Sequence, residues 1–443
     1  MAVEDETMKN PKGILTGFAA TLWMFMGTHV MGQGSLTPPG APGETMHTLE
    51  EVYERTDPRT PISSLPYIIT EPGSYYVTGN LSSTGRHGIV IESSGVTVDL
   101  MGFSLTGDGT SSFPNFDGGI YVDGSTNAVI DRVTIKGGSI SGFLDGLNCE
   151  YMNNSRIEQM VLSDNADDGV FLTGWNGQCN GNTITDCTIS GNGGRGVYLH
   201  GWYGQCDGNT IADCSISGNG GRGVDLNGYR GQCNGNTIAD STISGNGNRG
   251  VGLDGSNYGQ CDGNTITDCT ISGNGGSGVS LNGKSRGQCD GNTISDCTIS
   301  ENVPAGVTLY GFNGQCDGNI ISDCAISGNG LIGVSLDGQT GQCDGNTIQE
   351  NTISKSMYKG ISLNYADGNR VEANTVWGTT GPGPKYGIQT TNTTDNFILK
   401  NTCMGNGINY DLDSDDTFGP IVEAAGELGT ADGASHPWAN FSR

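Results

Sequence analysis

Basic residues are scarce in this chain. Among its 443 residues, 20 lysines and arginines face 47 aspartates and glutamates, which gives a formal net charge of −27. Such a surface argues against nucleic acid as a partner, because phosphate binding requires clusters of Lys and Arg. Proline is infrequent too, with 14 residues, and the 76 glycines follow no strict Gly-X-Y period, so the chain is not a collagen. Apolar residues occur as short doublets among Gly, Asn and Thr, which excludes a helical bundle.

Long apolar runs are also missing, with one exception near the N-terminus. Lys9 and Lys12 precede a largely apolar run over residues 14–30, and two small residues, Gly32 and Gly34, follow it. This order predicts a signal peptide over residues 1–34 that is removed on export. A retained membrane anchor is the alternative, because the run approaches the length that spans a bilayer. No other membrane span is expected once the signal is removed, and we expect a secreted or cell-surface protein.

Internal repetition dominates the rest of the sequence. The tripeptide Gly-Gln-Cys recurs seven times, at steps of 27 or 28 residues. Its cysteines are Cys179, Cys206, Cys233, Cys261, Cys289, Cys316 and Cys343. Within each unit the apolar residues lie two apart, as in Val197 and Leu199, which is the period of a β-strand. Short strands and turns repeated at this interval predict an all-β fold, a single-stranded parallel β-helix.

Less regular copies of the Gly-Val-x-Leu strand extend the array from residue 88 to residue 390. Together they predict about twelve coils, each of which buries its apolar side chains against its neighbours, so the two ends need caps. We assign residues 35–65 to a linker and N-terminal cap, residues 66–415 to the β-helix, and residues 416–443 to a C-terminal capping segment. The Thr-Leu-Glu-Glu sequence at residues 48–51 is a capping box, which predicts a short helix in the N-terminal cap.

The coil pattern Asn-x-Ile-x-x-(Asn/Cys)-x-Ile-x-x-Asn, followed by Gly-Val-x-Leu, resembles the pectate-lyase-like right-handed β-helix superfamily. Segments 61–77 and 437–441 are similar to a group of secreted, uncharacterised bacterial β-helix repeat proteins. The resemblance implies a right-handed coil. It implies no single activity, because that superfamily contains lyases, hydrolases, epimerases, tailspikes and adhesins.

Fourteen cysteines in an exported chain raise the question of disulfides. Besides the Gly-Gln-Cys column, five cysteines occupy a turn position at which β-helices stack asparagines: Cys187, Cys214, Cys269, Cys297 and Cys324. Ser241 and Asn351 take the same position in other coils, which favours small inward side chains and buried free thiols. Partial disulfides are the alternative, because adjacent coils bring cysteines within pairing distance. Zinc is not indicated, because no Cys-x-x-Cys pair occurs.

Two rows of mainly acidic residues repeat on the outside of the predicted coils. One row contains Asp186, Asp213, Asp240, Asp268, Asp296, Asp323 and Glu350. The other contains Asp207, Asp262, Asp290, Asp317 and Asp344, with Asn180 and Asn234 at equivalent positions. A solvated acidic face explains both rows. Calcium is the alternative, because Ca²⁺ prefers several carboxylate and carbonyl oxygens as ligands, and the sequence indicates no other cofactor.

The position before Gly-Val-x-Leu changes character in the middle of the array. It holds Asp145 and Asp168, with Asp167 beside the latter, and then Arg195, Arg222 and Arg249 in consecutive coils. Trp175, Trp202 and Tyr229 follow the same strands. Aromatic rings stack on sugar rings, arginine forks bind uronate or sulfate, and paired carboxylates can act as acid and base. These nine residues therefore form the predicted binding site for a polysaccharide. The arginines form a cationic stripe whose mutual repulsion an anionic polysaccharide would relieve. A charge-compensated ladder, in which Asp145 and Asp168 stabilise the arginines, is the alternative.

Part of this arrangement is similar to the polygalacturonase family, whose aspartates lie on consecutive coils at this strand. Asp145 and the Asp167–Asp168 pair have a comparable register. Leu144 stands where that family has Thr, Arg195 replaces the histidine of its Gly-His-Gly motif, and Arg222-Gly-Val replaces its Arg-Ile-Lys. Neither a pectate-lyase Ca²⁺ trio nor the epimerase Asp-Pro-His-Glu motif is identifiable, so no complete catalytic motif is assigned.

Two functions are therefore compatible with the sequence. The first is a secreted β-helix protein that binds polysaccharide along its first parallel sheet, with a depolymerising hydrolase or lyase activity left open. The second is a non-enzymatic structural or adhesive protein of the cell envelope. The even coils between Cys179 and Cys343 favour the second, and the break in charge and aromatic content between Asp145 and Arg249 favours the first.

Overall fold

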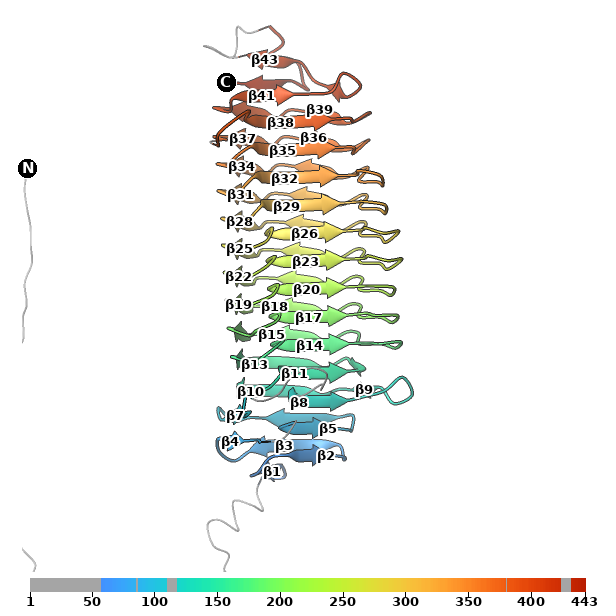
Figure 1. Cartoon of the computed structure of the whole chain (residues 1–443), viewed down its shortest axis with the longest axis vertical. Coiled ribbons are helices and arrows are strands. Elements are labelled where there is room, and N and C mark those ends of the chain that lie inside the picture. The colour runs from blue at the N-terminus through green and yellow to red at the C-terminus, as the bar shows by residue number, and fades with distance from the viewer. Residues whose placement is uncertain (1–56, 85–86, 110–117, 380, 424–431) are drawn as a thin grey trace, which may run out of the picture. The chain divides into compact units, whose positions relative to one another are not determined.

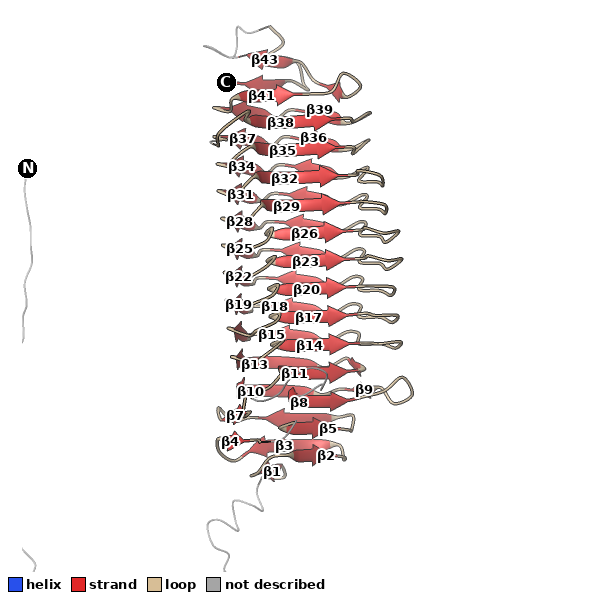
Figure 2. Ribbon diagram, viewed as in Figure 1, coloured by secondary structure: helices blue, strands red, loops and turns tan. Residues whose placement is uncertain are grey.

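A computed structural model of the chain describes residues 57–84, 87–109, 118–379, 381–423 and 432–443. The predicted signal peptide and cap helix lie outside these residues. Pro58–Arg443 form one compact unit, and every regular element in its described part is a β-strand (Figure 2), which confirms the all-β prediction. Within the described ranges there is no helix with the length and apolar character needed to cross a bilayer.

Fourteen strands stack in parallel, in chain order, as one continuous sheet (Figure 1), the first sheet. They are β2 (Tyr67–Ile69), β5 (Ile89–Ile91), β8 (Gly118–Asp123), β11 (Asp145–Glu150), β14 (Val170–Thr173), β17 (Val197–His200), β20 (Val224–Asn227), β23 (Val251–Asp254), β26 (Val279–Asn282), β29 (Ala305–Tyr310), β32 (Ile332–Asp337), β35 (Lys359–Asn364), β38 (Tyr386–Thr391) and β41 (Ile408–Asp411). Strands β5 to β38 belong to the expected coils, and β2 and β41 add one strand at each end. The parallel β-helix of about twelve coils is thus confirmed.

The remaining wall of the β-helix is a 28-stranded parallel sheet made of two columns. The first column contains β1 (Thr60–Ile62), β3 (Gly73–Val77), β6 (Val96–Asp99), β10 (Thr134–Ser141), β13 (Arg156–Ser163), β15 (Thr183–Thr185), β18 (Thr210–Ala212), β21 (Thr237–Ala239), β24 (Thr265–Thr267), β27 (Thr293–Ser295), β30 (Ile320–Ser322), β33 (Thr347–Gln349), β36 (Arg370–Glu372), β39 (Phe397–Leu399) and β42 (Thr417–Phe418). The second contains β4 (Leu81–Ser82), β7 (Ser104–Thr106), β16 (Thr188–Ser190), β19 (Ser215–Ser217), β22 (Thr242–Ser244), β25 (Thr270–Ser272), β28 (Thr298–Ser300), β31 (Ala325–Ser327), β34 (Thr352–Ser354), β37 (Thr375–Trp377), β40 (Thr402–Met404), β43 (Ile421–Glu423) and β44 (Asn440–Ser442). The long strands β10 and β13 pair with both columns. A separate short pair joins β9 (Ile130–Asp131) to β12 (Met152–Asn153).

The core of each coil comes from the strand residues that point inward. Val197 and Leu199 of β17 are fully buried, and they pair in register with Val224 and Leu226 of β20. The glycine that opens each Gly-Val-x-Leu segment is needed for close packing. A Cβ atom on Gly196 would lie 2.4 Å from Cγ2 of Ile216 in the next coil. Any larger residue there would push adjacent coils apart.

Buried asparagines connect the coils at the turns. In one column, seven of them run from Asn165 to Asn329, and six side-chain amides donate to the next coil's amide oxygen at 2.9 to 3.1 Å. A second column runs from Asn182 to Asn396 with the same geometry. The same oxygen also accepts the backbone N–H of the preceding coil's asparagine, as Asn264 does from Asn236 at 2.8 Å. The ladders therefore satisfy buried polar groups that water cannot reach.

The two acidic rows have different local roles. Asp186 and its equivalents occupy exposed turns with positive φ, near 55°, a conformation that Asp and Asn tolerate better than most residues. In the other row each carboxylate accepts a backbone N–H from the next coil, as Asp290 does from Asp317 at 2.7 Å. Burial raises the pKa of Asp290 to about 6. Both rows thus have a structural explanation in the turns.

All fourteen cysteines are buried free thiols, in agreement with the first of the two interpretations. Burial raises the pKa of Cys179, Cys233 and Cys289 well above the usual range, so these thiols stay protonated and unreactive. In the turn column, Cys187 donates from Sγ to the carbonyl two residues before it. Ser241 and Asn351 donate to the equivalent carbonyls. Cysteine thus replaces a small polar residue of the ladder.

Replacing Asn264 by Ala tests the asparagine ladder. The substitution leaves the backbone N–H and the side-chain amide of Asn236 without their acceptor. Each unsatisfied buried group costs about 1–3 kcal/mol, so we expect the free energy of unfolding in urea to fall by roughly 3 kcal/mol or more. Thr270→Ala, on the exposed side of β25, is the control and should change it little. Equal effects of the two substitutions would contradict the role of the ladder.

Candidate functional site

A groove of about 420 Å³ lies on the first sheet where the coils of β11, β14 and β17 meet. Six of the nine predicted site residues line it: Asp145, Asp167, Asp168, Trp175, Arg195 and Trp202. The other three, Arg222, Arg249 and Tyr229, are outside its lining. The structure therefore brings the aspartates together with both tryptophans, and separates them from most of the arginine row. This feature is referred to below as the groove.

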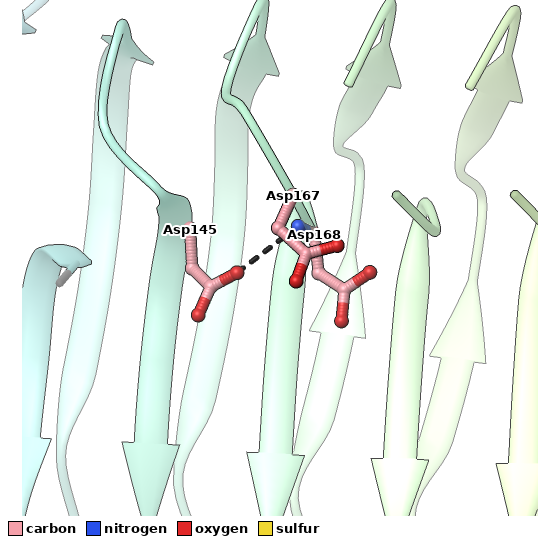
Figure 3. A group of neighbouring side chains, drawn as sticks. All are labelled: Asp145, Asp167 and Asp168. Carbon is pink, nitrogen blue, oxygen red and sulfur yellow. Dashed lines mark hydrogen bonds between the residues drawn. The ribbon is translucent and has the colours of Figure 1, made fainter. Parts of the chain in front are cut away.

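Three of the carboxylates that line the groove lie close together on adjacent coils (Figure 3). Asp145 opens β11, and Asp167 and Asp168 precede β14, so the parallel register brings them side by side. One oxygen from each lies within 4.8 Å of the others. The backbone N–H of Asp168 donates to Oδ1 of Asp145 at 3.0 Å, and Nδ2 of Asn148 donates to its Oδ2 at 2.9 Å. These three aspartates are referred to as the aspartate trio.

The environment of Asp145 and Asp168 favours their protonated forms. Asp145 and Asp168 are only 4% and 3% exposed. Burial raises the pKa of Asp145 well above its usual range, and the adjacent Asp168 raises it further. Burial also raises the pKa of Asp168, to about 7, although the guanidinium of Arg195 opposes the shift. A carboxyl group with such a pKa can donate a proton near neutral pH.

Arg195 and Arg222 are neutralised by a residue that the sequence analysis did not select. Asp225 of β20 is 1% exposed and accepts a hydrogen bond from Nε of Arg195 at 2.8 Å. It also forms an ion pair with Arg222, which lies 3.8 Å from Asp254. The expected cationic stripe is therefore wrong for two of its three arginines, because Asp225 already relieves their repulsion. The ion pair between Arg195 and Asp168, at 3.6 Å, agrees with the alternative of a compensated ladder.

Aromatic side chains form a continuous wall next to the trio. The rings of Trp175 and Trp202 stack at 4.7 Å, and those of Phe171 and Tyr198 stack at 5.1 Å. His200 lies between the two pairs, 4.8 Å from Tyr198 and 5.7 Å from Trp202. Burial lowers the pKa of His200 to about 4, so the imidazole is neutral at pH 7. These five side chains are referred to as the aromatic wall.

Two features of the wall leave it available to a ligand. Trp175 is 43% exposed, so one of its faces is open to solvent. The indole N–H of Trp202 is buried and has no hydrogen-bond partner among the described residues. Tyr229 packs edge-on against Trp202 at 6.3 Å and so supports the wall from outside the groove.

Glu150, Tyr151 and Asp225 are the functional candidates that sequence reasoning missed. Glu150 and Tyr151 line the groove, and Asp225 fixes Arg195. The sequence pattern did contain a signal that could have identified Asp225. It stands at the outward position of Gly-Val-x-Leu, where the preceding coils carry Phe171 and Tyr198, and it is the first acid in that row next to the arginines.

The aspartate trio is also the group that could hold a cation. Among the described residues, no other set of three metal-ligating side chains has its ligand atoms this close together. Its ligands are all oxygens, which fits Ca²⁺ better than a transition metal. In the two acidic rows, by contrast, the carboxylates do not converge in threes within the described chain. Calcium binding, which the sequence analysis placed on the two acidic rows, stays a prediction, and the trio is a further candidate location for it.

Sequence comparison agrees with this architecture. The chain matches the family described as the right-handed β-helix region over residues 69–234, 202–317 and 287–417. These overlapping matches cover most of the chain, and it belongs to this family. The prediction of a right-handed β-helix is thereby confirmed. None of the curated proteins compared with the chain matches it.

Several solved structures share the fold at low sequence identity. The A-module of the Azotobacter vinelandii mannuronan C-5 epimerase AlgE6 is 16% identical with a TM-score of 0.48, and the match covers 76% of this chain and 89% of that one. Gene product 12 of bacteriophage phi29, in a pre-mature form, is 11% identical with a TM-score of 0.53, and the match covers 83% and 54%. A mutant tailspike protein of the E. coli bacteriophage HK620, solved with a hexasaccharide, is 11% identical with a TM-score of 0.46, and the match covers 88% and 72%. Identities this low show the fold alone.

The raised pKa of Asp168 predicts a pH-dependent stability. Its carboxyl is protonated in the folded protein up to about pH 7 but ionises near pH 4 when unfolded, so folding binds a proton between these values. Stability from this group is therefore full at low pH and is lost as the pH rises through about 7. We expect the melting temperature of Asp168→Asn, relative to the wild type, to increase from pH 5 to pH 8, because Asn cannot ionise.

Asp213→Asn, on an exposed turn, is the matched control. Its melting temperature relative to the wild type should not change with pH. A difference in melting temperature between Asp168→Asn and the wild type that stays flat or falls with pH would contradict the raised pKa of Asp168.

Repeating the melting-temperature measurement in millimolar CaCl₂ and in chelator tests the calcium prediction. A bound cation raises the melting temperature of the wild type, and Asp167→Asn removes that gain.

Proposed function

We propose that the protein binds a polysaccharide in the groove and hydrolyses it with the aspartate trio. The observation that carries this proposal is that buried carboxyl groups of raised pKa lie directly beside an open aromatic wall. Pockets for ligands combine apolar surface with a few converging polar groups, and carboxyl groups of perturbed pKa cluster at functional sites.

Binding follows from the shape and chemistry of the wall. The faces of sugar rings are apolar, so they stack on exposed indole rings such as that of Trp175. Sugar hydroxyl groups can donate hydrogen bonds to the carboxyl oxygens of Asp167, which lines the groove. The sheet continues beyond the groove in both directions, so an extended chain can lie along it.

The trio supplies the two groups that glycoside hydrolysis requires. Asp168, protonated near neutral pH, donates its proton to the glycosidic oxygen as the bond from that oxygen to the anomeric carbon breaks. Asp167, which is half-buried, attacks the anomeric carbon through a carboxyl oxygen, and a water then releases the sugar with Asp168 acting as base. Carboxyl oxygens within 4.8 Å of one another match the short separation of glycosidases that attack directly, rather than the longer separation that accommodates the attacking water. Asp145 positions Asp168 through its backbone hydrogen bond.

A non-enzymatic structural or adhesive protein is the second candidate. The regular coils between Cys179 and Cys343 favour it, because closely similar coils provide a rigid spacer or adhesive surface and need no catalytic site. In that case the groove would bind a saccharide without cleaving it. A lyase would use the same groove but release unsaturated products. In all three cases we propose a secreted or cell-surface protein whose partner is a polysaccharide.

A screen of purified polysaccharides tests this proposal. We expect at least one to bind the wild type and to release reducing ends. Trp202→Ala should weaken that binding roughly tenfold, equivalent to about 1.4 kcal/mol. Tyr258→Ala, an exposed aromatic of a distant turn, is the control and should leave the affinity unchanged.

Asp168→Asn separates cleavage from binding. Loss of a general acid lowers the rate by about 10²–10⁴-fold, while the affinity for the same polysaccharide should change little. Binding without any release of reducing ends by the wild type would support the adhesive alternative. If no polysaccharide binds, the proposed function is wrong.

A further inference from the structure

A second pocket lies on the first sheet, three coils beyond the aspartate trio. It has a volume of about 420 Å³ and is lined by residues of β26 and β29 and of the segments just before β23, β26 and β29. Its polar and charged lining includes Arg249, Lys284, Ser277, Ser280, Thr308 and Tyr310. Among the described residues no carboxylate lines it, in a chain with a net charge of −27. It is referred to as the Arg249 pocket.

Arg249 differs from the two arginines that precede it in the row. Arg195 and Arg222 both bind Asp225, which is the acid closest to the row. Asp254, on the other side, lies 3.8 Å from Arg222. Within the described chain Arg249 has no ion-pair partner, and its Nη1 is buried without a hydrogen bond. Burial lowers the pKa of Arg249 and the charge of Arg222 lowers it further, although the carboxylates of Asp254 and Asp225, which form no ion pair with it, oppose the shift.

An unpaired, largely buried guanidinium destabilises the folded protein, because its charge loses hydration without a compensating partner. An anion in the pocket would supply that partner. Guanidinium N–H groups form a planar fork that matches carboxylate, sulfate and phosphate oxygens. Lys284, which has no ion pair among the described residues, adds a second positive charge, and the buried hydroxyls of Ser277 and Ser280 provide neutral donors.

We propose that the Arg249 pocket binds the anionic group of the saccharide chain that occupies the groove, so that the protein selects an acidic polysaccharide. This inference rests on the proposed function for the identity of the ligand. Three coils at about 4.8 Å each separate the trio from Arg249, a distance of about 14 Å along the sheet. An extended oligosaccharide of a few units covers that distance. The carboxylate of a uronic acid and a sulfate ester present the same oxygens, and the probes below distinguish them.

The test uses small anions and two matched arginine variants. Sodium galacturonate, sodium sulfate and neutral galactose are titrated into the full chain at constant ionic strength by calorimetry. We expect one or both anions to bind the wild type, galactose to bind this pocket undetectably, and Arg249→Gln to weaken anion binding roughly tenfold or more. Arg286→Gln removes the same charge from an exposed turn and should leave the anion affinity unchanged. The better-bound anion identifies uronate or sulfate as the preferred group.

Melting temperatures separate binding from a structural role. Removing an unpaired buried charge should leave the melting temperature of Arg249→Gln equal to or above that of the wild type. A clear fall would mean that Arg249 stabilises the fold, and equal anion binding by wild type and Arg249→Gln would mean that the pocket is not the anion site; either result overturns the inference.

Oligosaccharides distinguish this inference from the proposed function. If acidic and neutral oligosaccharides of the same backbone bind the wild type equally, the proposed selection of acidic polysaccharides by Arg249 is wrong. The groove then remains a saccharide site. If no oligosaccharide binds but sulfate still binds through Arg249, the proposed function is wrong, and with it the assignment of the anion to a saccharide.

Discussion

Every buried side-chain amide of this β-helix needs a hydrogen-bond partner, and the stacking of the coils depends on this requirement. An asparagine inside a coil, such as Asn264, pairs through its side-chain amide with the equivalent asparagines of the two adjacent coils, at 3.0 Å in either direction. An unpaired buried amide costs on the order of 1–3 kcal/mol, so a shift of one residue between coils would break every rung at once. The ladders thereby fix the register of the strands between them, and each outward side chain lies directly above its equivalent.

That fixed register explains why the site is a local feature of a repetitive protein. From β23 to β35 the rungs of the first sheet repeat small outward residues, such as Ser335 and Ser362. In β14 and β17 the same position carries the rings of Phe171 and Tyr198, and the carboxylates of the trio lie at the start of β11 and just before β14. Stacking these residues in register creates the groove. Beyond it, Asp225 neutralises two arginines and Arg249 is left without a partner. The position before Gly-Val-x-Leu therefore changes from buried acids, through compensated arginines, to an unpaired and largely buried arginine.

The features that depend only on the register of the coils could be predicted from the sequence. The spacing of Gly-Gln-Cys gave the coil length, and alternation placed Val197 and Leu199 inside β17. The convergence of Asp145 with Asp168 followed from their common position before adjacent strands. Side-chain direction could not be predicted, because a long arginine can reach up or down the stack. Asp225 binds Arg222 of its own coil and Arg195 of the preceding coil, and only coordinates distinguish that arrangement from a stripe of free cations. For the same reason, the sequence could not predict that Arg249 lacks an ion-pair partner.

The central claim is that the aromatic wall, and not the regular scaffold, binds the polysaccharide. Its most direct test replaces the wall by the residues of the regular coil at β32, where Ser335 and Gln339 occupy the equivalent positions. The variant carries Phe171→Ser, Tyr198→Ser, Trp175→Gln and Trp202→Gln, and the measurement is its affinity for the polysaccharide that the wild type binds. The account predicts a folded β-helix that no longer binds measurably. A folded variant that binds with wild-type affinity would contradict it.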